Sequence, residues 1–300
     1  MEQGNFDGAG NLYGTTVGGG SGTYDSGTVF ELERDPTGWT EKVLFAFDFN
    51  DGVRPTAGVI EDATGNLYGT ADVAFELSQG SGEWTETELH YFTGEHGDGL
   101  PPVFDLISDT SGKLYGTTYY GGYGVVFELV QKGVRWEEWV LYRFAGIPHD
   151  GAEPSSGVTL DSSGNLYGTT AIGGGTGCNG GCGTVYKLTR GAKGRWRERL
   201  LHTFGKGQNG NAPDGGVVVD KAGNLYGTTA YGGSGCDCGV IYKLTPGPKG
   251  KWRYTVLHAF TGIDGAVPTG GLTLDSKGNL YGGTALGGTT GNGIIFELTP

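Results

Sequence analysis

One short motif occurs six times in this sequence, and the repetition limits the possible folds more than any other feature. The string Gly-Asn-Leu-Tyr-Gly-Thr starts at Gly10, Gly65, Gly112, Gly164, Gly223 and Gly278, with Lys113 replacing Asn and Gly283 replacing Thr in single copies. An Asp stands three residues before each start. The copies are 47 to 59 residues apart. A period of this length indicates a tandem array of structural repeats.

Each repeat divides into four short runs with the composition of β-strands. They are an apolar run ending at the Asp, the Asn-Leu-Tyr-Gly-Thr run, a run such as Val-Phe-Glu-Leu, and a run from Trp to Phe. The third runs are Val29–Leu32, Ala74–Leu77, Val126–Leu129, Val185–Leu188, Ile241–Leu244 and Ile295–Leu298. The fourth runs are Trp39–Phe47, Trp84–Phe92, Trp136–Phe144, Trp196–Phe204 and Trp252–Phe260. No run follows helical periodicity, so four strands per repeat predict an all-β fold, a six-bladed β-propeller of antiparallel meander blades.

Three details of the blade follow from this assignment. The Asp-x-x-Gly-Asn link between the first two strands is expected to be a tight turn, with the Asp accepting backbone N–H groups. The Leu and Tyr of the second strand are expected to pack between blades. Trp and Phe of the fourth strand are eight residues apart, which predicts that both lie on one strand face, because side chains alternate.

The last repeat is shorter than the others, since Pro300 stands where its fourth strand would begin. We therefore expect one domain, residues 1–300, whose sixth blade lacks its outer strand. Either the natural chain continues beyond Pro300, or the outer edge is left bare or is filled by another molecule, so self-association through the incomplete sixth blade is one hypothesis. The 63 glycines, together with 12% aromatic residues, favour short strands joined by tight turns over disorder.

The repeat resembles a known family. The Gly-Asn-Leu-Tyr-Gly-Thr-Thr string, a Gly-Gly loop, Gly-Thr-Val-Phe-Glu-Leu, an aromatic strand and Asp-Gly-x-x-Pro are together similar to the Gloeo/Verruco (GloVer) repeat. The resemblance covers nearly the whole chain, and only the second repeat departs from it, because Thr70–Ala74 lacks the Gly-Gly loop. It implies a propeller-like, extracellular or cell-surface bacterial protein and carries no established reaction.

The charge balance excludes some partners. The chain has 20 Lys and Arg against 33 Asp and Glu, a net charge of −13, so neither duplex nucleic acid nor an anionic membrane surface is expected to bind. No apolar stretch is long enough for a transmembrane helix, so membrane insertion is not expected. The segment 1–10 shows no secretory signal, and a mature chain that has lost its signal would look the same.

Candidate site residues gather in two sets of links that share one face of a meander propeller. The links between blades carry Asp-Gly-x-x-Pro or its Asn-Gly variant, with aspartates Asp51, Asp98, Asp150 and Asp264. Such carboxylates could surround a central funnel and hold a divalent cation such as Ca²⁺, with His96 or His149 as a general base. The simpler interpretation is that Asp-Gly starts a turn and Pro makes it rigid, once per blade.

The four cysteines lie in equivalent loops of the fourth and fifth repeats, at Cys178, Cys182, Cys236 and Cys238. Two local disulfides fit an extracellular protein, whereas the spacings fit a zinc site poorly. Pairing between the two loops is a third possibility. The nearby Gly175–Gly180 matches Gly-x-Gly-x-x-Gly, but it leads into a strand rather than a helix, so no dinucleotide cofactor is expected.

Tyr119, Tyr120, Tyr123 and Tyr231 lie in the links between second and third strands, where they could stack on sugar rings or cover neighbouring loops. The first hypothesis is a non-catalytic extracellular propeller that binds a glycan or protein partner, or serves as a structural unit. The alternative is a hydrolase or lyase that uses a divalent cation in the funnel. No cofactor other than such an ion is expected.

Overall fold

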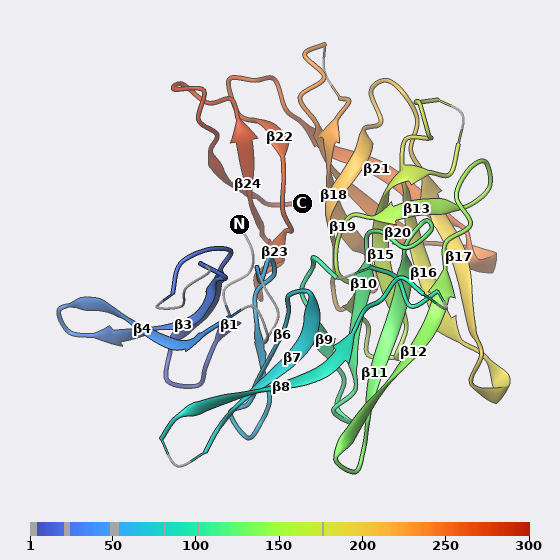
Figure 1. Ribbon diagram of the computed structural model, residues 1–300. Coiled ribbons are helices and arrows are strands. Elements are labelled where there is room, and N and C mark those ends of the chain that lie inside the picture. Colours follow the sequence, from blue (N-terminus) through green and yellow to red (C-terminus); the bar gives the residue numbers. More distant parts are fainter. Residues whose placement is uncertain are drawn as a thin grey trace. The chain divides into compact units, whose positions relative to one another are not determined.

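The fold is the all-β, six-bladed β-propeller that the repeats predict. A computed structural model describes residues 5–20, 25–48, 54–80, 82–95, 97–100, 102–175, 177–233 and 235–300, and its strands form six antiparallel sheets, one for each repeat (Figure 1). Two 3-10 turns, η1 (Ala192–Gly194) and η2 (Pro248–Gly250), are the only helical segments within these ranges. Neither they nor any other described segment is a helix capable of crossing a membrane.

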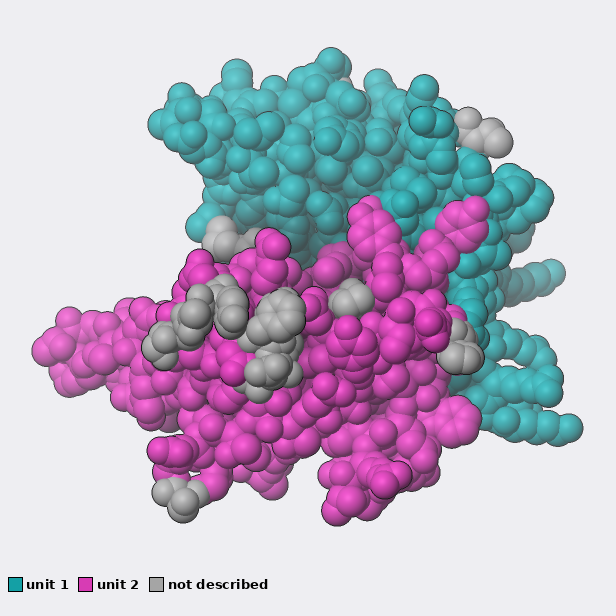
Figure 2. Space-filling view, viewed as in Figure 1, with its two compact units in different colours: residues 1, 142–300 teal, residues 2–141 magenta. Residues whose placement is uncertain are grey.

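The chain divides into two compact units, residues 2–141 and residues 1 and 142–300 (Figure 2). The strands of the first unit are β1 (Asn5–Phe6), β2 (Leu12–Thr16), β3 (Thr28–Asp35) and β4 (Gly38–Ala46) in blade one, β5 (Ile60–Glu61), β6 (Leu67–Thr70), β7 (Val73–Gln79) and β8 (Trp84–Tyr91) in blade two, and β9 (Ile107–Ser108), β10 (Leu114–Thr118), β11 (Val125–Lys132) and β12 (Arg135–Arg143) in blade three. Each blade keeps the sequential order of a meander.

The second unit starts near the end of β12 and holds blades four to six. Its strands are β13 (Gly151–Pro154), β14 (Thr159–Leu160), β15 (Leu166–Gly173), β16 (Thr184–Arg190) and β17 (Trp196–Thr203) in blade four, β18 (Asn211–Val219), β19 (Leu225–Tyr231), β20 (Val240–Pro246) and β21 (Trp252–Ala259) in blade five, and β22 (Ala266–Pro268), β23 (Thr273–Leu274), β24 (Leu280–Leu286) and β25 (Ile295–Leu298) in blade six. Among the described residues β25 pairs only with β24, so blade six lacks an outer strand, as predicted.

Hydrophobic cores lie between successive blades. In the first unit, Tyr68 and Ala74 of blade two pack with Leu114 and Phe127 of blade three. In the second unit, Tyr167 of blade four belongs to a cluster with residues of blade five. The Leu of the second strand is at most 1% exposed in five of the six blades. The predicted packing of this Leu and Tyr between blades is confirmed within each unit.

The second Gly of the repeated motif is required by an aromatic ring on the next strand. In each blade this Gly lies opposite an aromatic residue of the third strand, as in Gly116 opposite Phe127 and Gly168 opposite Tyr186. A Cβ on Gly116 would lie 2.5 Å from Cζ of Phe127. A Cβ on Gly168 would overlap the hydroxyl of Tyr186. The ring covers the strand backbone directly, so no larger residue fits.

The prediction that Trp and Phe of the fourth strand share a face is wrong. In blade one Phe30 pairs with Val43 and Val29 with Phe45, which leaves Leu44 as a β-bulge between them. The same register shift occurs in blades two, four and five. One extra residue reverses the alternation of side chains, so the two aromatics face opposite blades. The contacts in blade five agree, because Trp252 packs on Tyr167 of blade four whereas Phe260 packs on Phe296 of blade six.

Candidate functional site

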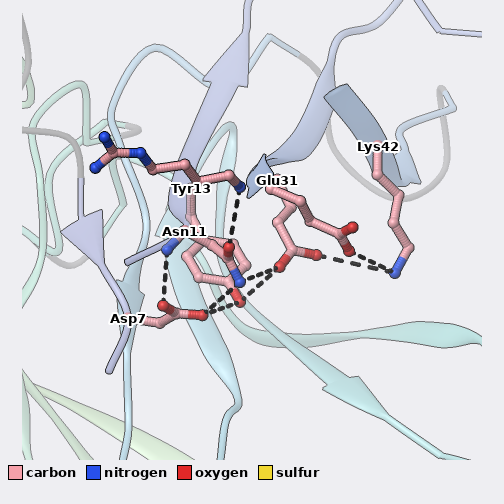
Figure 3. Close-up of polar contacts among 7 residues, drawn as sticks. Asp7, Asn11, Tyr13, Glu31 and Lys42 are labelled. Atoms are coloured by element: carbon pink, nitrogen blue, oxygen red, sulfur yellow. Dashed lines mark hydrogen bonds and ion pairs between the residues drawn. The ribbon is translucent and has the colours of Figure 1, made fainter. Parts of the chain in front are cut away.

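The Asp before each repeated motif forms a latch that closes the turn between the first two strands (Figure 3). In blade one, Oδ1 of Asp7 accepts the backbone N–H groups of Ala9 and Asn11, both at 2.8 Å. Its Oδ2 accepts the side-chain amide of Asn11 at 2.9 Å and the hydroxyl of Tyr13 at 3.4 Å. These four bonds use the acceptor positions of the carboxylate, so the Asp is structural rather than a free metal ligand.

The other five blades repeat the latch, with Lys113 replacing the Asn in blade three. The latch aspartates there are Asp62, Asp109, Asp161, Asp220 and Asp275. Burial opposes the ionisation of Asp161, but hydrogen bonds from Asn165, Tyr167 and Ser163 outweigh it and lower the pKa. The turn predicted from the sequence is confirmed, and its Tyr hydroxyl bond is an addition that sequence reasoning missed.

The Asp-Gly-x-x-Pro links lie beside the links between second and third strands, as expected for a meander. We call these two sets of links the loop face of a blade. In blade four the link is itself a short strand, β13, with Gly151 opposite Gly173 and Ala152 opposite Ile172 of β15. In blade three, the backbone N–H of Leu100 donates to the carbonyl of Tyr120 at 3.0 Å. The sequence indicated a turn here, and the structure adds strand pairing.

The described aspartates of these links are engaged by their own loops and by the strand that precedes each loop. Asp150 accepts bonds from the hydroxyl of Tyr142 at 2.9 Å and from the backbone N–H of Ala145 at 2.7 Å. Asp264 lies 2.9 Å from Nε2 of His258 and also accepts two bonds from Thr261. These contacts favour the interpretation of Asp-Gly as a structural turn.

Asp98 holds Thr93 in the same way, and His90 lies 3.8 Å from it. Each described Asp therefore faces the residue two positions before the last Phe of the preceding fourth strand. This constant position relative to the last Phe is visible in the sequence, and it could have predicted which residue each link Asp contacts. His202 occupies the same strand position, but the link after it carries Asn209 in place of Asp. His202 stacks on Tyr254, and burial lowers its pKa to about 4.

The funnel hypothesis receives no geometric support from the described residues. Within those ranges no three His, Cys, Asp or Glu side chains gather in a way that could hold a metal ion. His149 is exposed beside the buried Asp150. Asp51 and His96 lie outside the described residues. The assignment of the four link aspartates and of His96 and His149 to a binding site stays a prediction.

The residue before the Pro of the link connects blade two to blade one, blade five to blade four and blade six to blade five. Arg54, Glu153, Ala212 and Val267 have positive φ angles of 52° to 60°, which L-residues rarely adopt and which cost about 1–3 kcal/mol each. In this conformation the N–H of Ala212 donates to the carbonyl of Cys182 at 2.9 Å, and that of Val267 to Cys238 at 2.9 Å. The motif therefore serves blade-to-blade contact.

The Pro completes this contact by packing on a Gly of the preceding blade. A Cβ on Gly27 would lie 2.8 Å from Cδ of Pro55. Gly239 meets Pro268 in the same way, at 2.6 Å. In blades one, four and five, the Gly before the third strand and the Pro of the following link are thus one paired feature, although they lie in successive repeats.

The four cysteines form two local disulfides, Cys178–Cys182 and Cys236–Cys238, and no described cysteine is free. This confirms local pairing over a zinc site or a bridge between the loops. Cys182 and Cys238 are buried, and their carbonyls receive the blade-to-blade hydrogen bonds. The disulfides therefore constrain the loops at the points where the next blade is held.

The loop tyrosines are partly solvent-exposed. Tyr120 and Tyr123 are 58% and 49% exposed, and Tyr119 packs edge-on against Tyr120 with ring centroids 4.5 Å apart. Leu100, 40% exposed, belongs to the same loop face. Tyr231 is 46% exposed in the other unit. Tyr119 and Tyr120 thus contact each other, Tyr123 belongs to the same loop, and Tyr231 lies in the other unit.

Comparison with solved structures supports the fold. A luciferin-regenerating enzyme matches with a TM-score of 0.60 and 14% identity, covering all of this chain and 91% of that one. PorZ, described as an essential bacterial surface component of the type-IX secretion system of Porphyromonas gingivalis, matches with a TM-score of 0.56 and 13% identity. That match covers 99% of this chain, which spans 40% of PorZ. Such identities show a shared fold alone.

Sequence comparison gives a narrower result. No curated protein matches the chain. Residues 174–300, which hold blades five and six and the last strands of blade four, match the Gloeobacter/Verrucomicrobia repeat family and so confirm, over that part of the chain, the family expected from its motifs.

Proposed function

We propose that this chain is a non-catalytic, extracellular β-propeller protein that binds a glycan through the loop face of blade three. The observation that carries the proposal is the exposure of Tyr120 and Tyr123 within a loop that has no role in the blade core. Aromatic side chains with one apolar face and a polar hydroxyl suit contact with sugar rings. The test below distinguishes glycan binding from binding of a protein partner at the same residues.

The loop is held firmly enough to present these rings. Leu100 bonds to the carbonyl of Tyr120, and a Cβ on Gly121 would overlap the backbone of Gly99. Thr118 also donates its hydroxyl to the carbonyl of Tyr120 at 3.1 Å. A binding surface that is already ordered loses less conformational entropy when the ligand binds.

An extracellular location is part of the proposal. Two disulfides persist in oxidising compartments and are rare in the reducing cytosol. The matched PorZ is described as a bacterial surface component, although it is a longer chain. A fold shared with a surface protein and two local disulfides together support a position outside the cytoplasm.

The test is a titration of the chain with neutral cello-, xylo- and chito-oligosaccharides, followed by tyrosine fluorescence and calorimetry. We expect saturable binding to at least one series, weakened about tenfold or more by Tyr120→Ala or Tyr123→Ala, with an unchanged melting temperature. Val134→Ala is the matched control, because Val134 is 97% exposed at the opposite end of the same blade. Binding that survives both Tyr variants would overturn the proposal, and so would capture of a protein alone.

A further inference from the structure

The net charge of the chain conceals a strong difference between its two units. Residues 2–141 carry 6 Lys and Arg against 23 Asp and Glu, a net charge of −17. Residues 142–300 carry 14 against 10, a net charge of +4. The expectation that neither duplex nucleic acid nor an anionic membrane surface binds came from the average charge, and that average does not describe the second unit by itself.

The basic residues of the second unit concentrate on the outer hairpins of blades four and five. We call six of them the basic hairpin surface: Arg195, Arg197, Arg199, Lys249, Lys251 and Arg253. All six are solvent-exposed. The hairpins are β16–η1–β17 and β20–η2–β21, whose outer strands β17 and β21 contact each other (Figure 1). The guanidinium of Arg199 reaches Gly250 of the neighbouring hairpin, so the two blades form one surface.

The arginines at the start of β17, together with Arg195 just before it, lie in extended backbone and point the same way. Arg195, Arg197 and Arg199 occupy every second position, so they share one strand face with neighbours about 6.6 Å apart along the chain. Glu198 is on the opposite face, where burial and then the negative charge of Asp150 raise its pKa to about 7. It therefore does not neutralise the arginines. Lys251, just before β21, and Arg253 within it repeat the same spacing.

The six cations have no anionic partner in the part of the chain that the structure describes. None of them belongs to an ion pair there, although the chain as a whole has many more carboxylates than basic groups. Exposed, unpaired cations held side by side repel one another, so their clustering has a cost that an anionic ligand would remove.

Blade architecture does not require these residues. The positions of Arg195 and Arg197 are occupied by Gly38 and Thr40 in blade one and by Glu83 and Thr85 in blade two, on the same outer strand. The blade therefore forms equally well with neutral or acidic side chains at these places. Arginines at positions where the fold does not require them indicate a role in binding.

We infer that the basic hairpin surface binds an anionic polysaccharide, one that carries sulfate or carboxylate groups at intervals along a flexible chain. The planar guanidinium group donates paired hydrogen bonds that match both anions. Duplex DNA fits less well, because it is rigid and carries one charge per about 1.7 Å, and the net charge of the whole protein would repel it. This inference uses residues other than the loop tyrosines and does not rest on the proposed function.

The experiment measures binding of the full chain to dextran sulfate and to alginate at low salt, with neutral dextran as the blank. We expect both anionic polymers to bind, neutral dextran not to bind, and affinity to fall steeply with salt. The variant Arg195→Gln/Arg197→Gln keeps Arg199 and its contact with Gly250. We expect it to bind at least about fivefold more weakly, with an unchanged melting temperature.

The matched control is Lys132→Gln/Arg135→Gln, which removes the same charge from exposed residues of the outer hairpin of blade three, formed by β11 and β12. Binding of the control should stay within about twofold of the unmodified chain. Equal losses in both variants would overturn the inference by showing a net-charge effect only. Tighter binding to duplex DNA than to either polysaccharide would also overturn it. So would salt-sensitive self-association that the arginine variant abolishes, since the partner would then be a second copy.

Discussion

Residues 2–141 and residues 142–300 are built from the same blade and differ almost only at its outside. Both units contain the Asp latch, the Gly beneath an aromatic ring and cores between successive blades. Only the second unit has cysteines and the basic hairpins. In its blades four and five, the aromatic residue that covers the second Gly of the motif is tyrosine rather than phenylalanine. Positions between blades are constrained by packing, whereas loops and hairpins can vary and acquire binding roles.

The strongest test of the shared interior is Gly168→Ala in the second unit against Gly116→Ala in the first. Each new methyl group would overlap the facing aromatic ring, so we expect a loss of about 2 to 3 kcal/mol in the free energy of unfolding in both cases. Urea unfolding followed by circular dichroism measures it. Gly205→Ala is the control, because nothing lies within 4 Å of its added Cβ. A loss in one unit only would show that the two interiors are not equivalent.

Removing a disulfide tests the difference between the loops. We expect Cys178→Ser/Cys182→Ser to lower the free energy of unfolding by about 2 kcal/mol, because a short closed loop restricts the unfolded chain by roughly that amount. Amide hydrogen exchange should rise in β16 and at Ala212, whose N–H bonds to Cys182. Exchange in β7 is the internal reference. If β7 responded as strongly as β16, the disulfide would not be a local constraint of the second unit.

The smallest expected effect concerns the two tyrosines that replace phenylalanine. The hydroxyl of Tyr186 is fully buried without a hydrogen-bond partner among the described residues. We expect Tyr186→Phe to raise the free energy of unfolding by about 1 kcal/mol, since an unpaired buried hydroxyl is removed.

In the same blade, we expect Tyr167→Phe to change the free energy of unfolding in the opposite direction. Its hydroxyl donates to Asp161 at 2.9 Å, so its loss should destabilise by about 1 kcal/mol. Thermal denaturation of both variants against the unmodified chain is sufficient. Destabilisation by Tyr186→Phe would mean that its hydroxyl has a partner after all, such as a bound water.

Several parts of the fold could be predicted because they depend on local, repeated chemistry. The six copies of the motif determined the number of blades, and the Asp-x-x-Gly spacing identified the turn. The parity of Trp and Phe failed because a β-bulge at Leu44 and its equivalents leaves no mark in the residue spacing. The candidate site was harder to predict, since the partners of Asp150 and Asp264 lie on a preceding strand.

By itself, the sequence determined that this protein is a repeat of four-stranded blades, because strand periodicity and turn residues act over a few neighbouring positions. Only the tertiary structure decided why particular residues recur. The Gly at position 168 and its equivalents recur because an aromatic ring of the next strand covers each of them, and the Pro of three links packs on a Gly of the preceding blade. The structure also gathered Arg199 and its neighbours onto one surface within an acidic chain. Such contacts join residues distant in sequence, and a one-dimensional pattern records their identity but not their proximity.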